Sequence, residues 1–320
     1  MAQPGPEVIE QVAVIGAGAI GASWATLFLA HGLSVAVYDP APDTERKVRD
    51  FIARAWPTMA RLGLAARADP DRLGFHADPA DAVQGASVVQ ESGPENLAAK
   101  QALFARLEQG LAPDAIVASS TSGLLPSDLQ AGRIGPGRYL VAHPFNPPHL
   151  MPLVELVGGR DTDPAVIERA AAFYRSIGKR PIAIRREMPG HVANRMQAAL
   201  YREAIHLALE GVASIEDIDA AISYGPGLRW AFMGPHMLHH LAGGERGLRH
   251  LLEHIGPGLQ SWWNDLGRPD LTPEVIDRLV GMFEAADPRS IQDLAAERDA
   301  LLLALLESLA EARRGREGQG

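Results

Sequence analysis

The sequence feature that most constrains this chain is a glycine pattern, G-x-G-x-x-G, in the run Gly16-Ala17-Gly18-Ala19-Ile20-Gly21. The pattern follows an apolar run, 12–15, that is typical of a buried strand, and it opens a helical pattern over 20–31. In that context the first glycine permits a tight turn, the second lets a phosphate approach the backbone, and the third lets the helix pack closely on the strand. The helix N-terminus then presents free N–H groups and the positive end of its dipole to an anion. The chain is therefore expected to fold around a nucleotide-binding βα unit.

Asp39 follows the next strand-like run, 35–38, and lies 18 residues after Gly21. A carboxylate at this place in a dinucleotide-binding unit accepts hydrogen bonds from both ribose hydroxyls. It would also repel the 2′-phosphate of NADP, and no arginine follows it in 40–42. The sequence therefore predicts NAD as the cofactor, with FAD, which shares the glycine pattern, as the main alternative.

The N-terminal half as a whole alternates short apolar runs with helical patterns. The runs expected to form strands are 12–15, 35–38, 87–90, 115–118, 139–142 and 152–157. Alternation of this kind predicts a doubly wound, mainly parallel sheet. Near Pro189 the pattern changes, and the helices expected beyond it are 191–211, 214–224, 273–286 and 290–313. The predicted fold class is thus α/β, with an N-terminal Rossmann domain, 1–188, followed by an all-helical C-terminal domain, 189–320.

Composition excludes several classes of protein. The formal net charge of −9 argues against a nucleic-acid or anionic-membrane surface, although a local basic pocket can still bind an anionic substrate. The chain has no cysteine, which rules out disulfides, thiolate metal sites and a cysteine nucleophile. The N-terminal segment 1–10 is polar and lacks the basic start and apolar run of a secretory signal. A cytoplasmic location, without membrane contact, is the expectation.

Four polar side chains fall where such a sheet is expected to carry chemistry, near strand ends or at the domain junction. They are Ser122, His143, Glu155 and Asn194. A histidine, whose ordinary pKa lies near neutrality, suits removal of a hydroxyl proton, and a neighbouring carboxylate would fix its tautomer and stabilise the imidazolium. Ser122 and Asn194 could hydrogen-bond the reacting oxygen. Each residue taken singly also has a structural interpretation, such as a turn cap or a surface ion pair, so the hypothesis depends on their joint occurrence.

Together these residues resemble the L-3-hydroxyacyl-CoA dehydrogenase superfamily over nearly the whole chain. The family's catalytic Ser, His, Glu and Asn are matched by Ser122 in S-S-T-S, His143 in H-x-F-N-P, Glu155 twelve residues later, and Asn194 in P-G-x-x-x-N-R. Glu95 and Lys100 are similar to the family's nicotinamide-side contacts. The resemblance implies a Rossmann domain followed by a helical domain that dimerises. A homodimer is therefore expected, since the helical half needs a partner to cover its apolar faces.

A finer resemblance is to members of the family that act on free hydroxy acids, L-carnitine 3-dehydrogenase and, less closely, L-gulonate 3-dehydrogenase (lambda-crystallin). It rests on the stretches 143–157 and 227–234. The resemblance implies that Arg229 binds a substrate carboxylate, which a guanidinium can do with two parallel hydrogen bonds. Trp230 or Phe232 could face a quaternary ammonium, which aromatic faces attract, or could equally be core residues of the helical domain.

The sequence thus predicts NAD-dependent oxidation of the 3-hydroxyl of a small free 3-hydroxy acid, carnitine-like or gulonate-like, to the 3-keto acid with a His-Glu base. An L-3-hydroxyacyl-CoA dehydrogenase is the nearest alternative: the CoA-binding arm of those enzymes is lysine-rich, whereas 44–72 contains only Lys47 beside several arginines. A non-catalytic crystallin-like or nucleotide-sensing protein is the remote alternative. No metal site is expected, because no carboxylate completes a motif with the histidines in 236–240 and 250–254.

Overall fold

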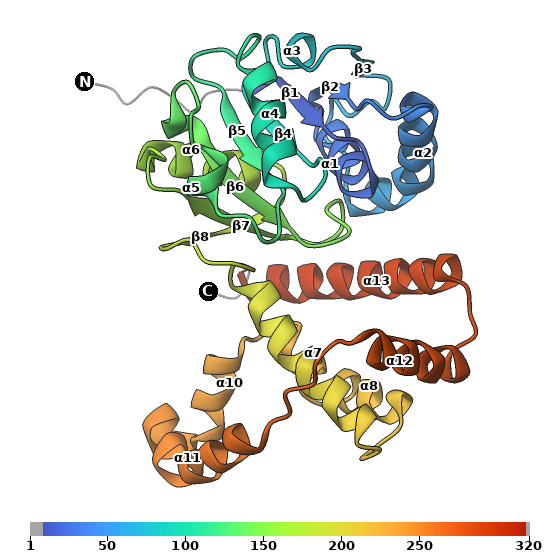
Figure 1. Ribbon diagram of the computed structural model, residues 1–320, viewed down its shortest axis with the longest axis vertical. Coiled ribbons are helices and arrows are strands. Elements are labelled where there is room, and N and C mark those ends of the chain that lie inside the picture. Colours follow the sequence, from blue (N-terminus) through green and yellow to red (C-terminus); the bar gives the residue numbers. More distant parts are fainter. Residues whose placement is uncertain (1–8, 318–320) are drawn as a thin grey trace. The chain divides into compact units, whose positions relative to one another are not determined.

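The computed structural model describes residues 9–317, and the chain divides into two compact units, Met1–Asn194 and Arg195–Gly320 (Figure 1). The polar N-terminal segment that bears on the expected location lies almost wholly outside the described residues. Among the helices within 9–317, none has both the length and the apolar character that crossing a membrane requires.

An eight-stranded sheet forms the centre of the first unit, with the strand order β3-β2-β1-β4-β5-β6-β7-β8. Its strands are β1 (Gln11–Ile15), β2 (Ser34–Tyr38), β3 (Leu73–Phe75), β4 (Val88–Glu91), β5 (Ile116–Ser119), β6 (Tyr139–Pro144), β7 (Leu153–Gly158) and β8 (Arg180–Ile184). Every neighbouring pair is parallel except β6 and β7, which are antiparallel. The strand order switches direction between β1 and β4, the place where doubly wound sheets bind nucleotides. The predicted fold class is confirmed.

Two of these strands, β3 and β8, are not predicted by the sequence pattern. The first has only three residues and contains Gly74, so it offers no apolar run. The second begins with Arg180 and Pro181 and lies at the edge of the sheet, where much of it stays exposed. Edge strands carry a weaker hydrophobic pattern than central ones, which explains both omissions.

Helices cover both faces of the sheet (Figure 1). They are α1 (Ala19–Ala30), α2 (Thr44–Leu62), α3 (Pro79–Ala82), α4 (Leu97–Leu107), α5 (Pro126–Leu129), the 3₁₀ turn η1 (Pro136–Arg138) and α6 (Pro164–Ser176). On one face Val12 and Val14 of β1 pack with α1, α2 and α6, and on the other Ala13 and Ile15 pack with α3, α4 and α5. Because strand side chains alternate between faces, a continuous apolar strand is what two covered faces require.

The second unit is helical throughout the part that the structure describes. Its helices are α7 (Ala193–Leu209), which begins at the end of the first unit, α8 (Ile215–Ser223), α9 (Pro226–Trp230), α10 (Pro235–Ala242), the 3₁₀ turn η2 (Gly244–Arg246), α11 (Gly247–Asp265), α12 (Pro273–Ala286) and α13 (Ile291–Glu317). Ser214 caps α8 by accepting a hydrogen bond from the N–H of Asp217 at 3.1 Å.

Lys179, in the turn before β8, is buried although it is a lysine. Its ammonium donates hydrogen bonds to the carbonyl oxygens of Pro148 and, at 2.7 Å, Met151, and it lies 4.9 Å from the centroid of the Trp24 ring. These contacts tie the segment that follows β6 to the core. Burial lowers the pKa of Lys179 to about 7.

This lowered pKa predicts a pH-dependent contribution to stability. In the unfolded chain Lys179 titrates near 10.5, so between pH 7 and 10 the unfolded state binds more protons than the folded state. The free energy of unfolding should therefore rise with pH across this window, by at most about 1.4 kcal/mol per pH unit for one proton. Urea titrations of wild type and K179M at several pH values should show the rise in wild type alone. The exposed Lys47 supplies the control, K47M, whose curve should parallel that of wild type. Parallel curves for wild type and K179M would contradict the prediction.

Candidate active site

The glycine pattern forms an open turn between β1 and α1. Gly16 has a φ of +90°, and a β-carbon there would lie 2.6 Å from the backbone nitrogen of Gly93, after β4. At Gly21 a β-carbon would collide with the carbonyl oxygen of Gly16. Gly18, the N-cap of α1, is different: it is exposed, and a β-carbon there would meet no protein atom within 4 Å. Two glycines therefore serve the fold, while Gly18 leaves backbone exposed at a helix N-terminus.

Asp39 lies beside this turn, directly after β2. Its carboxylate accepts hydrogen bonds from the N–H of Ala17 at 2.6 Å and of Ala41 at 2.8 Å. The carboxylate is thus held against the glycine turn, where it can still accept bonds from ribose hydroxyls through its remaining lone pairs. Helix α1 begins at Ala19, and no side chain caps its N-terminus. The N–H groups of its first turn, which includes Ile20, therefore remain available to phosphate. The observed geometry fits a dinucleotide.

A buried ion pair lies under the neighbouring strand ends. Lys100 of α4 donates to the Glu91 carboxylate at 2.6 Å and to the carbonyl oxygen of Gly93 at 3.0 Å, and both charged side chains are almost fully buried. Glu91 also accepts bonds from the N–H of Gly93 and the hydroxyl of Ser119. Lys100 therefore shapes the backbone that faces Gly16. Its contact with the nicotinamide stays a prediction.

The register of β6 against β7 places His143 directly opposite Glu155. Opposed residues of an antiparallel pair project on the same face with their β-carbons close together. The Nδ1 of His143 lies 2.9 Å from a Glu155 carboxylate oxygen, and both side chains are buried. Since an ionised carboxylate only accepts, this bond places the proton on Nδ1 and leaves Nε2 as the basic nitrogen of the neutral ring.

The other oxygen of Glu155 accepts two backbone hydrogen bonds from the start of the next segment. The N–H groups of Val192 and Ala193 both donate to it at 3.0 Å. Burial acts to raise the pKa of Glu155, but the hydrogen bonds from His143, Ala193 and Val192 outweigh it and hold that pKa below its ordinary value. Glu155 is therefore ionised at neutral pH. The same segment brings the amide nitrogen of Asn194 to 3.4 Å from Nε2 of His143.

Ser122 lies on the exposed loop after β5, and Glu95 organises that loop. One Glu95 oxygen accepts bonds from the Thr121 hydroxyl at 2.6 Å, the Ser122 N–H at 3.1 Å and the Gly123 N–H at 2.9 Å. On the other side, Nε2 of His191 lies 3.1 Å from the carbonyl oxygen of Thr121. The loop that carries Ser122 is therefore linked to the segment that carries Asn194.

Two family models match consecutive parts of the chain. Residues 11–188 match the NAD binding domain of 3-hydroxyacyl-CoA dehydrogenase, and residues 190–280 match the C-terminal domain of the same enzyme. The chain belongs to the 3-hydroxyacyl-CoA dehydrogenase family. It is an NAD-dependent oxidoreductase that acts on a CH–OH group, and the predictions of this family and of NAD as its cofactor are confirmed.

Relatives within this family are similar over almost their full length. An L-carnitine dehydrogenase of Streptomyces coelicolor is 50% identical over 295 residues, which cover 92% of this chain and 93% of the relative. An L-carnitine dehydrogenase of a Pseudomonas species is 46% identical, with 94% of each chain covered. Among solved structures, a 5-formyl-3-hydroxy-2-methylpyridine 4-carboxylic acid 5-dehydrogenase, described as an NAD⁺-dependent dismutase, has a TM-score of 0.82 at 32% identity and covers 95% of this chain and 99% of its own.

The three residues that are predicted to bind the substrate lie in the helical unit. Arg229 and Trp230 are in α9, and Phe232 follows its end. All three are exposed in the single chain, with Trp230 41% and Phe232 56% accessible. Neither aromatic residue is thus a core residue of the isolated helical unit. Over residues 9–317, no group of three or more His, Asp or Glu side chains is arranged to hold a metal ion.

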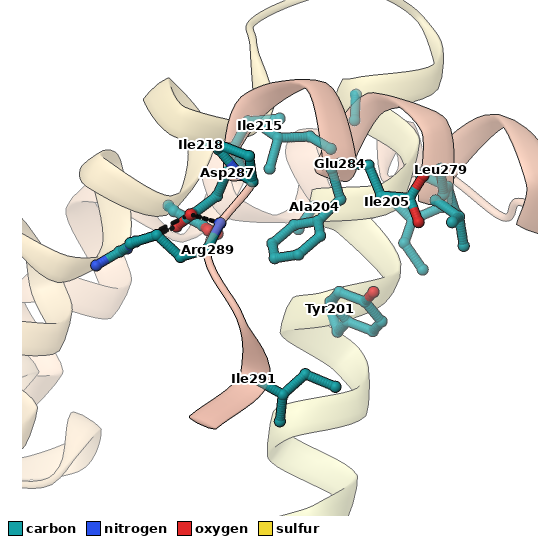
Figure 2. Close-up of a pocket in the computed structure, with 15 residues that line it drawn as sticks. Tyr201, Ala204, Ile205, Ile215, Ile218, Leu279, Glu284, Asp287, Arg289 and Ile291 are labelled. Carbon is teal, nitrogen blue, oxygen red and sulfur yellow. Dashed lines mark hydrogen bonds and ion pairs between the residues drawn. The ribbon is translucent and has the colours of Figure 1, made fainter. Parts of the chain in front are cut away.

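The helical unit also contains an apolar cavity of about 780 Å³ (Figure 2). It lies among α7, α8 and α12, and Tyr201, Ile205, Ile218 and Phe283 contribute to its wall. Arg289, at one side, is hydrogen-bonded to Asp287. None of the four predicted catalytic residues lines it. Its apolar wall suits packing by another apolar surface.

Sequence reasoning missed two contributors to the site. His191 lies inside the quoted P-G-x-x-x-N-R motif, but the motif gives it no role. Glu91 ends an apolar strand, where a lone carboxylate gives no signal until its partner Lys100 is brought to it by folding. In both cases the evidence is a contact between segments distant in sequence.

Substitutions at Gly21 and Gly18 should distinguish an effect on folding from an effect on NAD binding. G21A should lower both the melting temperature and the affinity for NAD, because its β-carbon meets the backbone of Gly16. G18A is the matched control: its β-carbon meets no protein atom, so the melting temperature should change little. NAD binding should weaken by tenfold or more, a loss of at least about 1.4 kcal/mol, because the close approach of phosphate is lost. Thermal unfolding and calorimetric NAD titration measure the two effects. Unchanged NAD affinity in G18A would contradict this prediction.

Proposed function

We propose that this protein oxidises the 3-hydroxyl of a small free 3-hydroxy acid, with L-carnitine as the favoured substrate type and L-gulonate as the second, to the corresponding 3-keto acid. The observation that carries the proposal is the arrangement around His143, whose Nδ1 is occupied by Glu155 and whose Nε2 lies within reach of Asn194. That arrangement provides one basic nitrogen and one amide donor for a single alcohol oxygen.

In the proposed mechanism, Nε2 of His143 takes the hydroxyl proton. NAD, which the turn at Gly16–Gly21 and Asp39 would hold, would supply the acceptor for the hydride that leaves C3 of the substrate. Glu155 remains ionised and stabilises the imidazolium formed on His143, as its lowered pKa allows. Asn194 and Ser122 hydrogen-bond the oxygen as it becomes a carbonyl. Because the reaction releases a proton, oxidation should be favoured at alkaline pH.

Two observations support a free acid over a CoA thioester. The relatives of 46–50% identity are named L-carnitine dehydrogenases, and the 32% identical neighbour of high structural similarity is named for a carboxylic acid. The helix α2 contains a single lysine, Lys47, unlike the lysine-rich arm of the acyl-CoA enzymes, while its four arginines keep the acyl-CoA enzyme as the alternative. In this proposal Arg229 binds the substrate carboxylate, and Trp230 or Phe232 faces its quaternary ammonium.

We also propose a homodimer formed through the helical unit. The cavity in Figure 2 is apolar, and neighbouring side chains stay exposed in the single chain, among them Met196 at 60%, Tyr201 at 63% and Phe283 at 45%. Apolar surface of this kind marks an interaction site, and a second copy of the chain is the simplest partner that symmetry allows.

The proposed base predicts the effect of two substitutions. H143A should lower kcat by about 10²–10⁴-fold, the usual contribution of a positioned general base. E155Q should lower kcat by at least about tenfold, because the amide no longer stabilises the imidazolium. H76A, which removes an exposed histidine, is the matched control and should keep the wild-type rate. Stopped-flow NADH absorbance gives the rates. A near-normal kcat in H143A would refute the mechanism.

The proposed substrate class predicts the outcome of a panel of alcohols. NADH formation should occur with L-carnitine or L-gulonate and not with 3-hydroxybutyryl-CoA. R229M should raise KM for the acid by about 10–100-fold, as expected on loss of a charge-assisted bidentate contact, while R249M, at an arginine whose side chain is 85% exposed, should leave KM unchanged. Turnover with the thioester alone would favour the acyl-CoA alternative. NAD binding without turnover of any alcohol would favour the non-catalytic one.

A further inference from the structure

His191 is a second buried histidine beside the proposed base. Its side chain is fully buried, its φ is +51°, and its ring centroid lies 5.2 Å from that of His143 with the planes at 47°. A non-glycine residue in this left-handed region is uncommon, so the surrounding structure must hold it there. Nothing in the mechanism above uses this side chain.

The hydrogen bond of His191 fixes its tautomer. Its Nε2 lies 3.1 Å from the carbonyl oxygen of Thr121, and a carbonyl can only accept, so Nε2 carries the proton. Nδ1 is then an acceptor in the neutral ring, and it is buried without a hydrogen-bond partner among the described residues. Burial lowers the pKa of His191, and the neighbouring His143 lowers it further, so the ring stays neutral at physiological pH.

The bond to Thr121 holds one end of the peptide group that joins Thr121 to Ser122. The other end, the N–H of Ser122, donates to Glu95 at 3.1 Å. Because a peptide group is planar and rigid, fixing its oxygen and its N–H fixes its orientation. The next peptide is held as well, because the N–H of Gly123 donates to Glu95 at 2.9 Å. His191 on one side and Glu95 on the other therefore constrain the backbone on both sides of Ser122, and with it the direction in which its side chain leaves the backbone.

The backbone that follows His191 makes a second connection. The N–H groups of Val192 and Ala193 bind the Glu155 carboxylate, and Asn194 approaches His143. The turn 191–194 therefore contacts the loop after β5 through the side chain of His191. It contacts the His143–Glu155 pair through its backbone and through the side chain of Asn194.

We propose that His191 is a positioning residue that aligns Ser122 with the His143–Glu155 pair by holding the Thr121–Ser122 peptide through Nε2. This inference rests on the proposed function, because it requires that Ser122 contact the reacting oxygen. His191 itself touches neither substrate nor cofactor. Its effect on the rate passes through Ser122.

The test is a double-mutant cycle between His191 and Ser122. H191F keeps an aromatic ring but has no donor, and H191Q places an amide N–H near the position of Nε2. Both substitutions keep a side chain at the same positive φ, so backbone strain is matched between them. Each is measured alone and with S122A, with kcat, KM for both substrates, NAD affinity and melting temperature as the readouts. H191M serves if H191F does not fold, since methionine adapts to an irregular cavity.

We expect H191F to lower kcat by about tenfold, the effect of one lost hydrogen bond, with NAD affinity unchanged. H191Q should recover most of that rate. With S122A already present, H191F should lower kcat by less than about twofold, because residues that act through each other are not additive.

Two results would overturn the inference, and they differ in what else they overturn. If S122A is slow but H191F costs the same factor with and without it, His191 does not act through Ser122, and the proposed function stands. If S122A keeps the wild-type rate, Ser122 has no role in the reaction, and its part in the proposed mechanism falls together with this inference.

Discussion

The buried carboxylate of Glu155 is the interaction on which the rest of the site depends. One of its oxygens fixes the tautomer of His143, and the other accepts backbone N–H bonds from Val192 and from Ala193, where α7 begins. A buried carboxylate is stable only when such bonds replace its lost hydration. Here the same bonds that keep Glu155 charged also hold the turn at Val192 and Ala193, within the first unit, against β7 and bring Asn194 to the histidine. The charge, the tautomer and the position of the amide are therefore consequences of one arrangement.

A second buried carboxylate, Glu91, supports the glycine turn that is expected to bind the cofactor. Close approach of the β1 turn to the backbone after β4 requires Gly16, and that backbone is in turn held by the buried pair of Glu91 and Lys100. Burying an ion pair costs desolvation, which is offset only by good geometry and additional hydrogen bonds. Glu91 has such bonds from Gly93 and Ser119. The pair thus holds the backbone at Gly93, against which the proposed nucleotide-binding turn packs.

Features of the fold and the site could be predicted from the sequence where consecutive residues encode them, and not where they depend on contacts between distant segments. The glycine turn and the central strands are encoded by consecutive residues, and they were predictable. His143 and Glu155 are 12 residues apart and lie opposite each other in the antiparallel pair of β6 and β7. The spacing alone does not show that these strands are antiparallel. The edge strands β3 and β8 lack a pattern of their own. The contacts of His191, Lys100 and Glu95 join segments far apart in the chain, and no periodicity within one segment records them.

The residues to which we assign chemistry and those to which we assign substrate binding lie in different units of the chain. His143, Glu155, Ser122 and Asn194 all belong to the first unit, whose boundary falls directly after Asn194. Arg229 and its aromatic neighbours belong to the second. A protein named for a pyridine carboxylic acid shares the whole fold at 32% identity, and proteins named for carnitine share it at up to 50%. If proton removal is fixed by strand register and buried hydrogen bonds, it tolerates little change, whereas exposed residues on a short helix can be replaced without disturbing a core. Selection for a new substrate would then act on the helical unit and leave the His-Glu pair intact.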